Sequence, residues 1–523
     1  MSMLATGLSK EFCANELNAT SQPEAIRGEI ISILTSRLMS AEKNRAISDA
    51  VVRALIERGQ FYFHTERKDF DASMFFDKER KLLERVRSHS FLAWLSDWLR
   101  VNRADRGWSY IMAEVETVSL TDRNSIGIIP ARYWARKNDA IYISNGDGAM
   151  VRVTSDNVET VDNGTDEVLF ESGYALAPWN LTEPADPFET CSLFREAKYA
   201  AKHGLDLTRL MLLSMPTNPP CKPPLCFVGA IGSGKTRTGR GFAEFFGIPE
   251  VVNKVDNLDE ENFWVSVNVG GFFILDNADT RNRWLADTVS SHATGSVSQR
   301  RKLYSNQSTW TLKANSWVCL TTANPTFAGD AALADRLFVV RMDRRTDATS
   351  DEKLSEEIRS HRDSGLSFVA QTLSKTLADK GPVQRGLNQR HPDFADNAVR
   401  IGRALGRESE VIAALCAAES DKSRFCVEND IALGPALLGF MSGRTGWEGT
   451  AKELLDDLQN VDGNDMNATD KLGRPLWSAR RVGKRLNMLW PHLEKMIGAK
   501  QTKDRNHTTT YYFEPQSAEF AEC

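Results

Sequence analysis

The chain reads Gly-Ala-Ile-Gly-Ser-Gly-Lys-Thr from Gly229 to Thr236. This octapeptide fills the phosphate-loop pattern G-x-x-x-x-G-K-S/T, and it stands between an apolar run, Leu225–Val228, and an amphipathic run, Arg237–Phe246. In such a loop the backbone N–H groups surround a phosphate, the lysine supplies a charge for the β- and γ-phosphates, and the threonine supplies an oxygen for Mg²⁺. The sequence therefore predicts a site for ATP and Mg²⁺, and its cofactor-binding residues are Gly229, Gly232, Ser233, Gly234, Lys235 and Thr236.

The composition limits the kind of protein that this chain can be. Its 523 residues are enough for several domains, and 65 Lys and Arg against 70 Asp and Glu give a net charge of −5. A nucleic-acid contact must therefore be a local basic patch rather than a property of the whole surface. The sequence has no run of eighteen apolar residues and no signal-peptide pattern at its start, so we expect a cytoplasmic protein with no membrane partner.

Hydrophobic periodicity divides the chain into segments. Helical spacing of apolar residues runs from Glu24 to about Arg103, strand-like runs follow between Trp108 and Trp179, and helical spacing returns from about 350 to 440. A turn-rich stretch at 145–148, Asn-Gly-Asp-Gly, predicts a hairpin between two of the strand-like runs. We predict an α/β fold in five parts: an N-terminal helical region (1–105), a small α+β domain (106–190), a phosphate-loop ATPase core (191–348), a helical region (349–445) and a winged-helix domain (446–516).

A carboxylate ends the next apolar run after the loop. Gly271–Leu275 reads as a strand, and Asp276 follows it. In phosphate-loop ATPases a carboxylate at such a strand end holds Mg²⁺, so we assign Thr236 and Asp276 to the metal; a strand-terminal turn residue is the alternative role for Asp276. Asn277 stands where many of these enzymes place a water-activating glutamate. An amide cannot accept a proton, so Asp279, or a carboxylate from elsewhere, is the candidate for that task.

Two further strand-like runs are flanked by polar residues. Ser316–Thr322 is followed by Ala-Asn-Pro, and Asn324 is well placed to touch the γ-phosphate or the lytic water. Arg336 precedes the last apolar run, Leu337–Val340. Strand ends that offer a Gly-rich loop, Asp, Asn and then Arg in this order resemble the AAA+ ATPases. The likeness is strongest to superfamily 3 helicases and to the primase-helicases of phages, poxviruses and integrative elements.

This resemblance implies an AAA+-like core in a ring of identical subunits, expected to be a hexamer, with the nucleotide between subunits. It also implies an arginine finger that each subunit presents to its neighbour. Arg336 matches the finger position, with Arg341 and Arg345 as fallbacks; a surface arginine at a helix end is the other interpretation of Arg336. The predicted catalytic residues are Lys235, Asp276, Asn277, Asp279, Asn324 and Arg336.

A basic stretch lies between the magnesium strand and the strand that leads to Asn324. Residues 293–304 and 309–313 read as strand, polar turn and strand, and the superfamily 3 resemblance implies a hairpin that grips DNA in the ring channel. A solvated hairpin, or one at the subunit interface, is the alternative. The candidate DNA contacts are Arg300, Arg301, Lys302 and Lys313, with Tyr304 or Trp310 placed to stack on a base.

The C-terminal segment has the pattern of a winged helix. Residues 450–458 and 477–489 read as helices, and the strand-like runs 499–503 and 509–513 follow them. Residues 471–513 contain ten Lys or Arg and two acidic residues, in a chain that is acidic overall. We therefore predict a duplex-DNA contact on the second helix, with a protein-binding winged helix as the alternative. Its basic face consists of Arg480, Arg481, Lys484 and Arg485.

The leading prediction is ATP-driven translocation on DNA by a replicative helicase of a phage or integrated mobile element. The expected partners are single-stranded or forked DNA in the ring channel, duplex DNA at the winged helix, and a separate primase or replication initiator. Two other classes stay open: an ATP-switched DNA-binding regulator or defence protein, and a helicase loader or scaffold that does not unwind DNA. The sequence has no zinc knuckle and no recognisable carboxylate cluster for nucleotidyl transfer, so we do not predict primase activity.

Overall fold

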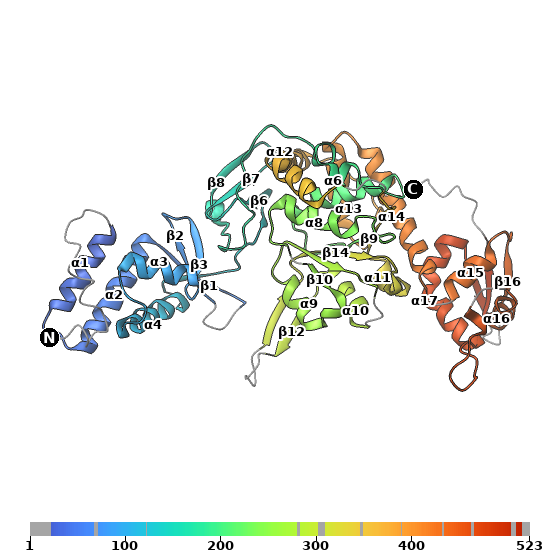
Figure 1. The fold of residues 1–523 in the computed structure, drawn as a ribbon, viewed down its shortest axis with the longest axis horizontal. Helices are drawn as coiled ribbons and strands as arrows, with labels where there is room; N and C mark the ends of the chain where they lie inside the picture. Colours follow the sequence, from blue (N-terminus) through green and yellow to red (C-terminus); the bar gives the residue numbers. More distant parts are fainter. Residues whose placement is uncertain are drawn as a thin grey trace. The chain divides into compact units, whose positions relative to one another are not determined.

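The computed structural model has a mixed α/β fold with several sheets, and the chain divides into two compact units (Figure 1). Unit 1 consists of Met1–Lys137, Tyr142–Arg152 and Thr160–Pro178. Unit 2 consists of Asn138–Ile141, Val153–Glu159 and Trp179–Cys523. The structure describes residues 22–66, 72–121, 123–250, 252–279, 283–301, 309–345, 349–388, 390–430, 433–461, 465–503 and 509–514.

Unit 1 packs four helices with a mixed sheet. In chain order its elements are α1 (Gln22–Thr35), α2 (Ser40–Arg58), β1 (Gly59–His64), β2 (Ser73–Asp77), β3 (Leu82–Arg85), α3 (His89–Leu99), α4 (Arg106–Leu120) and β4 (Ser125–Ile128). The sheet has the order β3-β2-β1-β4, with β1 antiparallel to β2 and parallel to β4. Side chains from the helices, such as Leu55, Leu95 and Val115, share one apolar core with Phe61 and Phe75 of the sheet.

The strands β1, β2 and β3 lie inside the region 1–105 that the sequence predicts as helical. All five residues of β2 are buried, so this strand lacks the alternation of polar and apolar residues that identifies a half-exposed strand in a sequence. The predicted helical spacing around Phe91, Leu95 and Trp98 is confirmed, because these residues lie buried along α3.

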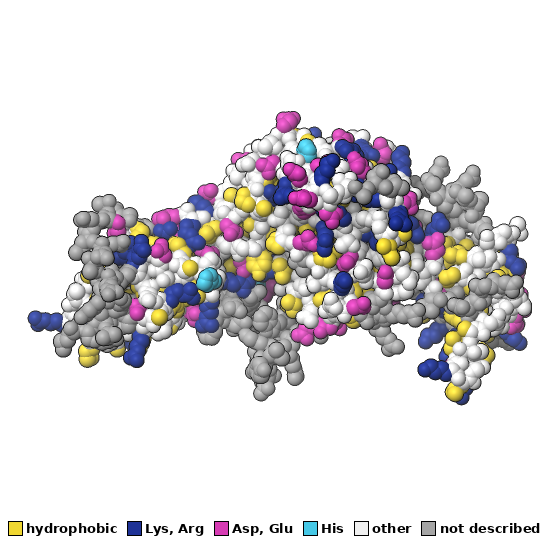
Figure 2. Space-filling model, viewed as in Figure 1, with side chains coloured by type: hydrophobic (Ala, Val, Ile, Leu, Met, Phe, Trp, Pro, Cys, Tyr) yellow, Lys and Arg dark blue, Asp and Glu magenta, His cyan; other side chains and the backbone are white. Residues whose placement is uncertain are grey.

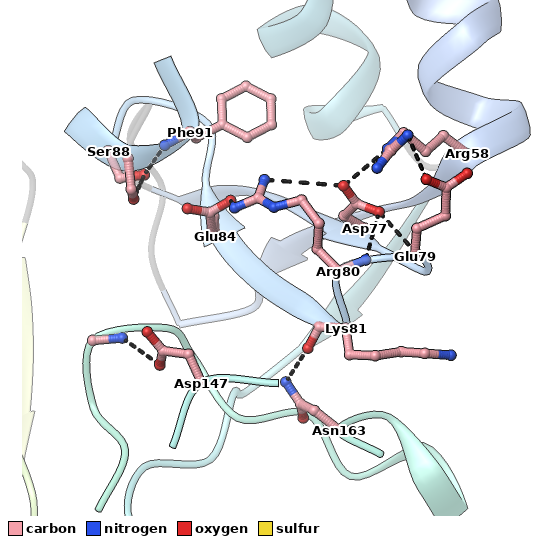
Figure 3. Close-up of polar contacts among 12 residues, drawn as sticks. Arg58, Asp77, Glu79, Arg80, Lys81, Glu84, Ser88, Phe91, Asp147 and Asn163 are labelled. Carbon is pink, nitrogen blue, oxygen red and sulfur yellow. Dashed lines mark hydrogen bonds and ion pairs between the residues drawn. The ribbon is translucent and has the colours of Figure 1, made fainter. Parts of the chain in front are cut away.

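A buried network of charges joins α2, β2 and β3 in unit 1 (Figure 3). Arg58 Nε donates to Asp77 Oδ2 at 2.9 Å, and Arg80 Nη2 donates to Glu84 Oε2 at 2.8 Å. The other oxygen of Asp77 accepts hydrogen bonds from two backbone N–H groups at 2.9 and 3.1 Å. Each charge therefore has an opposite charge beside it, and the network links the end of α2 to the sheet.

A second sheet has the order β5-β6-β7-β8. Its strands are β5 (Trp134–Lys137), β6 (Ala140–Ser144), β7 (Ala149–Val153) and β8 (Val158–Asp162). The predicted hairpin turn connects β6 to β7: the N–H of Asn145 donates to the carbonyl oxygen of Ala149 at 3.0 Å. Gly146 and Gly148 have φ values of 66° and 91°, a region that glycine enters without strain.

A five-stranded parallel sheet forms the centre of unit 2. Its order is β10-β11-β14-β9-β15, and every neighbouring pair is parallel. All carboxyl ends of these strands therefore lie at one edge of the sheet, where open α/β sheets bind their ligands. The strands are β9 (Leu225–Val228), β10 (Val252–Lys254), β11 (Phe272–Asp276), β14 (Trp317–Thr322) and β15 (Phe338–Arg341).

Helices and one hairpin complete the part of unit 2 around this sheet. The helix that follows β9 packs against β11 and β14, since a Cβ on Gly239 would touch side-chain atoms of Ile274 and Cys319. The helices are α5 (Pro187–Thr190), α6 (Ser192–Arg195), α7 (His203–Ser214), α8 (Lys235–Phe246), α9 (Glu260–Val267), α10 (Arg283–Ala293) and α11 (Ala331–Ala334), and the hairpin strands are β12 (Val297–Arg301) and β13 (Thr309–Lys313).

The helices predicted between about 350 and 440 are present. They are α12 (Asp351–Ala378), α13 (Pro392–Ala404), α14 (Glu408–Glu428) and α15 (Leu433–Met441). Arg362 of α12 donates to the carbonyl oxygens of Phe245 and Phe246 at 3.0 and 2.9 Å, so α12 satisfies acceptors at the carboxyl end of α8.

The C-terminal segment contains the two predicted helices and the two predicted strands. Thr450 caps α16 (Ala451–Gln459), Ser478 caps α17 (Ala479–Ile497), and β17 (Lys500–Lys503) pairs with β18 (Thr509–Phe513). A third strand, β16 (Trp447–Thr450), pairs with β18 and was not predicted. Apolar residues of this segment share a core with α14 and α15, so the predicted boundary at 445 crosses a continuous core within unit 2.

No helix within the described ranges is long and apolar enough to cross a membrane. The described side chains also contain no group of three or more His, Cys, Asp or Glu that could hold a metal ion.

Candidate functional site

The Gly229–Thr236 loop connects β9 to α8 at the carboxyl edge of the parallel sheet. Gly232 and Gly234 have φ values of 83° and 85°, and a Cβ on Gly229 would collide with the carbonyl oxygen of Met342. Gly234 is the N-cap of α8 and offers no side chain to the N–H groups of the first turn. The loop therefore has the backbone shape and the positive helix end that suit an anion.

Lys235 is the seventh residue of this loop and the first residue of α8. Its Nζ donates to the carbonyl oxygens of Gly229 and Ala230 at 2.7 and 2.9 Å. Burial lowers the pKa of Lys235, while the nearby carboxylates of Asp279 and Asp276 oppose that effect. The ammonium group is thus held within the loop, near both candidate carboxylates.

Asp276 ends β11, and its carboxylate lies against the start of α8. Its Oδ1 accepts hydrogen bonds from Thr236 Oγ1 at 2.6 Å and from Thr321 Oγ1 at 2.7 Å. The structure therefore brings together the two residues that the sequence assigns to Mg²⁺. Thr321 was missed, although a hydroxyl side chain next to the end of a buried strand is a signal that the sequence offers.

Asp279 is held at the end of β14. Its Oδ1 accepts hydrogen bonds from the N–H groups of Ala323 and Asn324 at 3.0 and 2.9 Å, and from the hydroxyl of Thr322. Among the described residues no hydrogen bond reaches Oδ2. Asp279 thus sits between two strand ends with one oxygen fixed and the other accessible to a ligand or water.

Asn277 has a left-handed backbone conformation, with a φ of 53°. This turn places the following residue, Ala278, in the core, where its N–H donates to the carbonyl oxygen of Thr321 at 2.8 Å. Asparagine enters this region more readily than most residues. The left-handed turn therefore accounts for an asparagine at position 277, and the sequence pattern alone did not reveal this turn.

The structure does not bring Arg336 to the loop of its own chain. Arg336 precedes β15 and lies at the amino edge of the sheet, whereas the loop follows the carboxyl end of β9. Its Nη1 donates to the carbonyl oxygen of Ala332. Asn324 is exposed just beyond β14, and its N–H binds Asp279.

The two fallback arginines lie at the other end of β15. Arg341 pairs with Asp421 at 3.1 Å and with Glu428 at 3.2 Å, both on α14 of the same chain. Arg345 lies beside the loop, together with Arg344, which sequence reasoning missed. No pattern in the sequence reveals that proximity, because it depends on where the chain runs after β15.

The basic stretch forms the predicted antiparallel hairpin, with Val297 opposite Lys313 and Arg301 opposite Thr309. Lys313 is therefore near the base of the hairpin, and its N–H donates to Asn268 Oδ1 at 2.9 Å. Lys302 and Tyr304 lie outside the described residues, and the side chains of Arg300, Arg301 and Trp310 are outside them as well.

The predicted basic face of α17 divides into two sets. Arg480, Arg481 and Lys484 are exposed. Figure 2 shows Lys and Arg side chains on the side of the molecule in view, in the region where Figure 1 places α16 and α17. Arg485 instead faces inward: its Nε donates to Asp430 Oδ1 at 2.6 Å, and its Nη2 donates to the carbonyl oxygen of Gly329 at 2.9 Å. Arg485 therefore joins α17 to the rest of unit 2.

Comparison with known proteins gives weak likenesses. No protein-family model and no curated protein matches the chain. Among solved structures, the chain is similar to "The A form apo structure of NrS-1 C terminal region-CTR", at 10% identity and a TM-score of 0.39, covering 89% of this chain and 98% of that one. It is also similar to a second structure of that region, titled "CTR(305-718)", at 9% identity and a TM-score of 0.36 with the same coverage. At these scores the likeness carries no conclusion about fold or function.

Proposed function

We propose that the protein is an AAA+-like ATPase that uses ATP to translocate on DNA, as a replicative helicase of a phage or mobile element. The observation that carries this proposal is the convergence of Lys235, Thr236, Asp276 and Asp279 at one edge of the parallel sheet. These residues follow two strands of the sheet, β9 and β11, and the end of a third strand, β14, holds Asp279. Together they offer a cation, a hydroxyl and two carboxylates beside a glycine loop. That set matches the needs of phosphoryl transfer.

The residues present fit a magnesium ion bound together with a nucleotide. Thr236 Oγ1 and Asp276 Oδ1 lie 2.6 Å apart, and both are the hard oxygen donors that Mg²⁺ prefers. Two protein oxygens are too few for a complete octahedral shell, which suits an ion whose other ligands are phosphates and waters. When bound, the ion would neutralise negative charge on the phosphates.

We assign a role to each of these residues from its position at the carboxyl edge of the sheet. Lys235 and the loop N–H groups bind the β- and γ-phosphates, and Thr236 with Asp276 hold the metal. Asp279 orients the attacking water through Oδ2, because Oδ1 already accepts hydrogen bonds from two N–H groups and a hydroxyl. Asn277 shapes the turn and takes no proton.

The position of Arg336 supports a role in another subunit. The four residues of β15 separate it from the carboxyl edge, which at about 3.3 Å per residue is a distance of about 13 Å. Arg336 is thus out of reach of its own loop. In a ring with head-to-tail contacts, expected to be a hexamer, this edge of one subunit can face the loop of the next.

Two basic regions support DNA as the partner. The exposed Arg480, Arg481 and Lys484 lie on the second helix of a helix–helix–hairpin segment, the recognition position of a winged helix. The hairpin β12–β13 supplies the second region, with Arg300, Arg301, Lys302 and Lys313 as its candidate contacts. The winged helix is expected to bind duplex DNA, and the hairpin a strand in the ring channel.

The test measures ATP hydrolysis with and without DNA, and displacement of a strand from a forked duplex. We expect DNA-stimulated hydrolysis and strand displacement in the wild type, and loss of both in Lys235→Ala and Asp276→Ala. Arg240→Ala is the matched control, because Arg240 is an exposed residue of α8 that pairs with Glu250 at 2.8 Å. Hydrolysis without strand displacement would instead identify an ATP-switched regulator or a helicase loader. Unchanged hydrolysis in Lys235→Ala would show that the Gly229–Thr236 loop is not the ATP site.

A further inference from the structure

The segment after β15 lies against the Gly229–Thr236 loop of the same chain. Arg344 Nε is 3.7 Å from the position that a Cβ on Gly232 would take. Arg345 Cδ is 3.3 Å from the corresponding position on Gly234. These are the two glycines whose positive φ shapes the loop, so both arginine side chains reach the loop itself.

The charges of these two arginines are not neutralised by the described part of the chain. Other arginines nearby are neutralised by carboxylates of the same chain. Arg341 pairs with two carboxylates of α14 at 3.1 and 3.2 Å, and Arg237 pairs with Glu244 at 3.1 Å. By contrast, neither Arg344 nor Arg345 forms an ion pair within the ranges that the structure describes. Two arginine side chains that form no ion pair among the described residues thus lie beside the loop that also contains the ammonium group of Lys235.

Cations that lie close together repel one another, and a polyanion between them removes that cost. Guanidinium groups bind phosphate oxygens through planar, charge-assisted hydrogen bonds. We propose that Arg344 and Arg345 bind the phosphates of the nucleotide held by the loop of their own subunit. This inference rests on the proposed function and extends it: the nucleotide is gripped from the β15 side by the same chain, and Arg345 is not a finger for the neighbour.

The first experiment measures binding of Mg²⁺-ATP and Mg²⁺-ADP to the full-length protein. Arg344→Gln and Arg345→Gln are each expected to weaken ATP binding about 10-fold, because a hydrogen bond to a charged group contributes about one order of magnitude or more to a binding constant. Arg240→Gln is the control and should bind as the wild type does. Arg344→Lys and Arg345→Lys should recover part of the loss, since lysine keeps the positive charge but lacks the planar guanidinium group with its paired N–H donors.

The outcomes separate the two proposals. A wild type that binds neither nucleotide contradicts the proposed function and this inference together. If the wild type binds ATP, Lys235→Ala does not, and both glutamine variants bind as the wild type does, this inference is wrong and the proposed function stands. Unfolding midpoints of the variants verify that they fold.

A second measurement needs no variant. Phenylglyoxal modifies accessible arginines, and mass spectrometry locates the modified residues. Mg²⁺-ATP should protect Arg344 and Arg345 in the wild type by several-fold and leave Arg240 equally reactive. Equal reactivity of Arg344 and Arg345 with and without bound ATP would overturn the proposal.

Mixed assemblies distinguish a contact within one subunit from a contact with the neighbour. Arg345→Gln subunits mixed with Lys235→Ala subunits should regain no hydrolysis beyond that of the separate variants, because both changes damage the same loop in the same chain. Arg336→Ala mixed with Lys235→Ala should regain some activity, since a finger acts on the neighbour. Recovery in the Arg345→Gln mixture would contradict the proposal and assign Arg345 to the neighbouring site.

Discussion

Two groups of charged side chains in this molecule are arranged in opposite ways. In unit 1, Arg58, Asp77, Arg80 and Glu84 form ion pairs with one another, and each charge is satisfied within the chain. At the Gly229–Thr236 loop, Lys235 binds only oxygens of its own loop, and no ion pair among the described residues involves it. Charges that pair with one another are used within the fold, whereas the ammonium group of Lys235, which forms no ion pair among the described residues, is available for a ligand.

The largest effect should come from the loop. Asp276→Ala removes the carboxylate that both Thr236 and Thr321 contact, and we expect ATP hydrolysis to fall by about 10³-fold or more, because the metal ligand stabilises charge in phosphoryl transfer. The unfolding midpoint should change little, since the carboxylate is only half-buried. Steady-state hydrolysis and thermal unfolding of the same preparation measure both quantities. Normal turnover in this variant would show that the convergence of residues is not an active site.

Substitution in the ion-paired group of unit 1 should lower the stability of the fold and leave ATP binding unchanged. Asp77→Ala removes the buried partner of Arg58 and leaves it only the exposed Glu79, at 2.7 Å; the loss of one member of a buried pair costs about 3–5 kcal/mol of stability. Hydrogen exchange of peptides that cover β1 to β3 should report faster opening, while ATP binding by the folded protein stays unchanged. A loss of ATP binding without faster exchange would assign the unit 1 network a functional role and break the contrast.

The carboxylate candidates for the water-orienting role give the next test. Asp279→Asn should lower the turnover number by about 10²-fold with a small change in the Michaelis constant, since positioned bases contribute about 10²–10⁴-fold. Asn277→Gly keeps a backbone that enters the left-handed region, so its turnover should change by less than a few fold. Equal losses in the two variants would remove the distinction between a base and a turn residue.

The smallest effect concerns the basic face of α17. Replacement of Arg480, Arg481 and Lys484 by Ala should flatten the salt dependence of duplex-DNA binding, with a change of up to about 2.7 in the slope of log binding constant against log salt. Arg485→Ala should mainly destabilise unit 2, because Arg485 pairs with Asp430 rather than facing solvent. Binding isotherms at several salt concentrations measure the slope. An unchanged slope in the triple variant would favour the protein-binding alternative.

The sequence predicts those features that depend on neighbouring residues. The loop, the strand that ends in Asp276, the hairpin turn at 145–148 and the two C-terminal helices follow from local patterns, and the structure contains all of them. The fully buried β2 escaped prediction because burial on both faces removes the alternation that marks a strand.

Contacts between distant parts of the chain could not be predicted. The pairing of Arg485 with Asp430 joins residues 55 positions apart, and the approach of Arg344 to Gly232 depends on the order of strands in the sheet. The left-handed turn at position 277 explains why an asparagine stands where many phosphate-loop ATPases have a glutamate. The local sequence shows that difference but not its reason. These are the points at which the fold, rather than the local sequence, decides what a side chain can do.

The most direct test is an electron cryomicroscopy map of the wild-type protein with Mg²⁺, a non-hydrolysable ATP analogue and forked DNA. We predict a ring in which the triphosphate lies in the Gly229–Thr236 loop, with the metal beside Thr236 and Asp276 and with Arg336 approaching from the neighbouring subunit. A map with the analogue bound elsewhere, or with the loop empty while the protein binds DNA, would contradict the central claim that this loop is the ATP site.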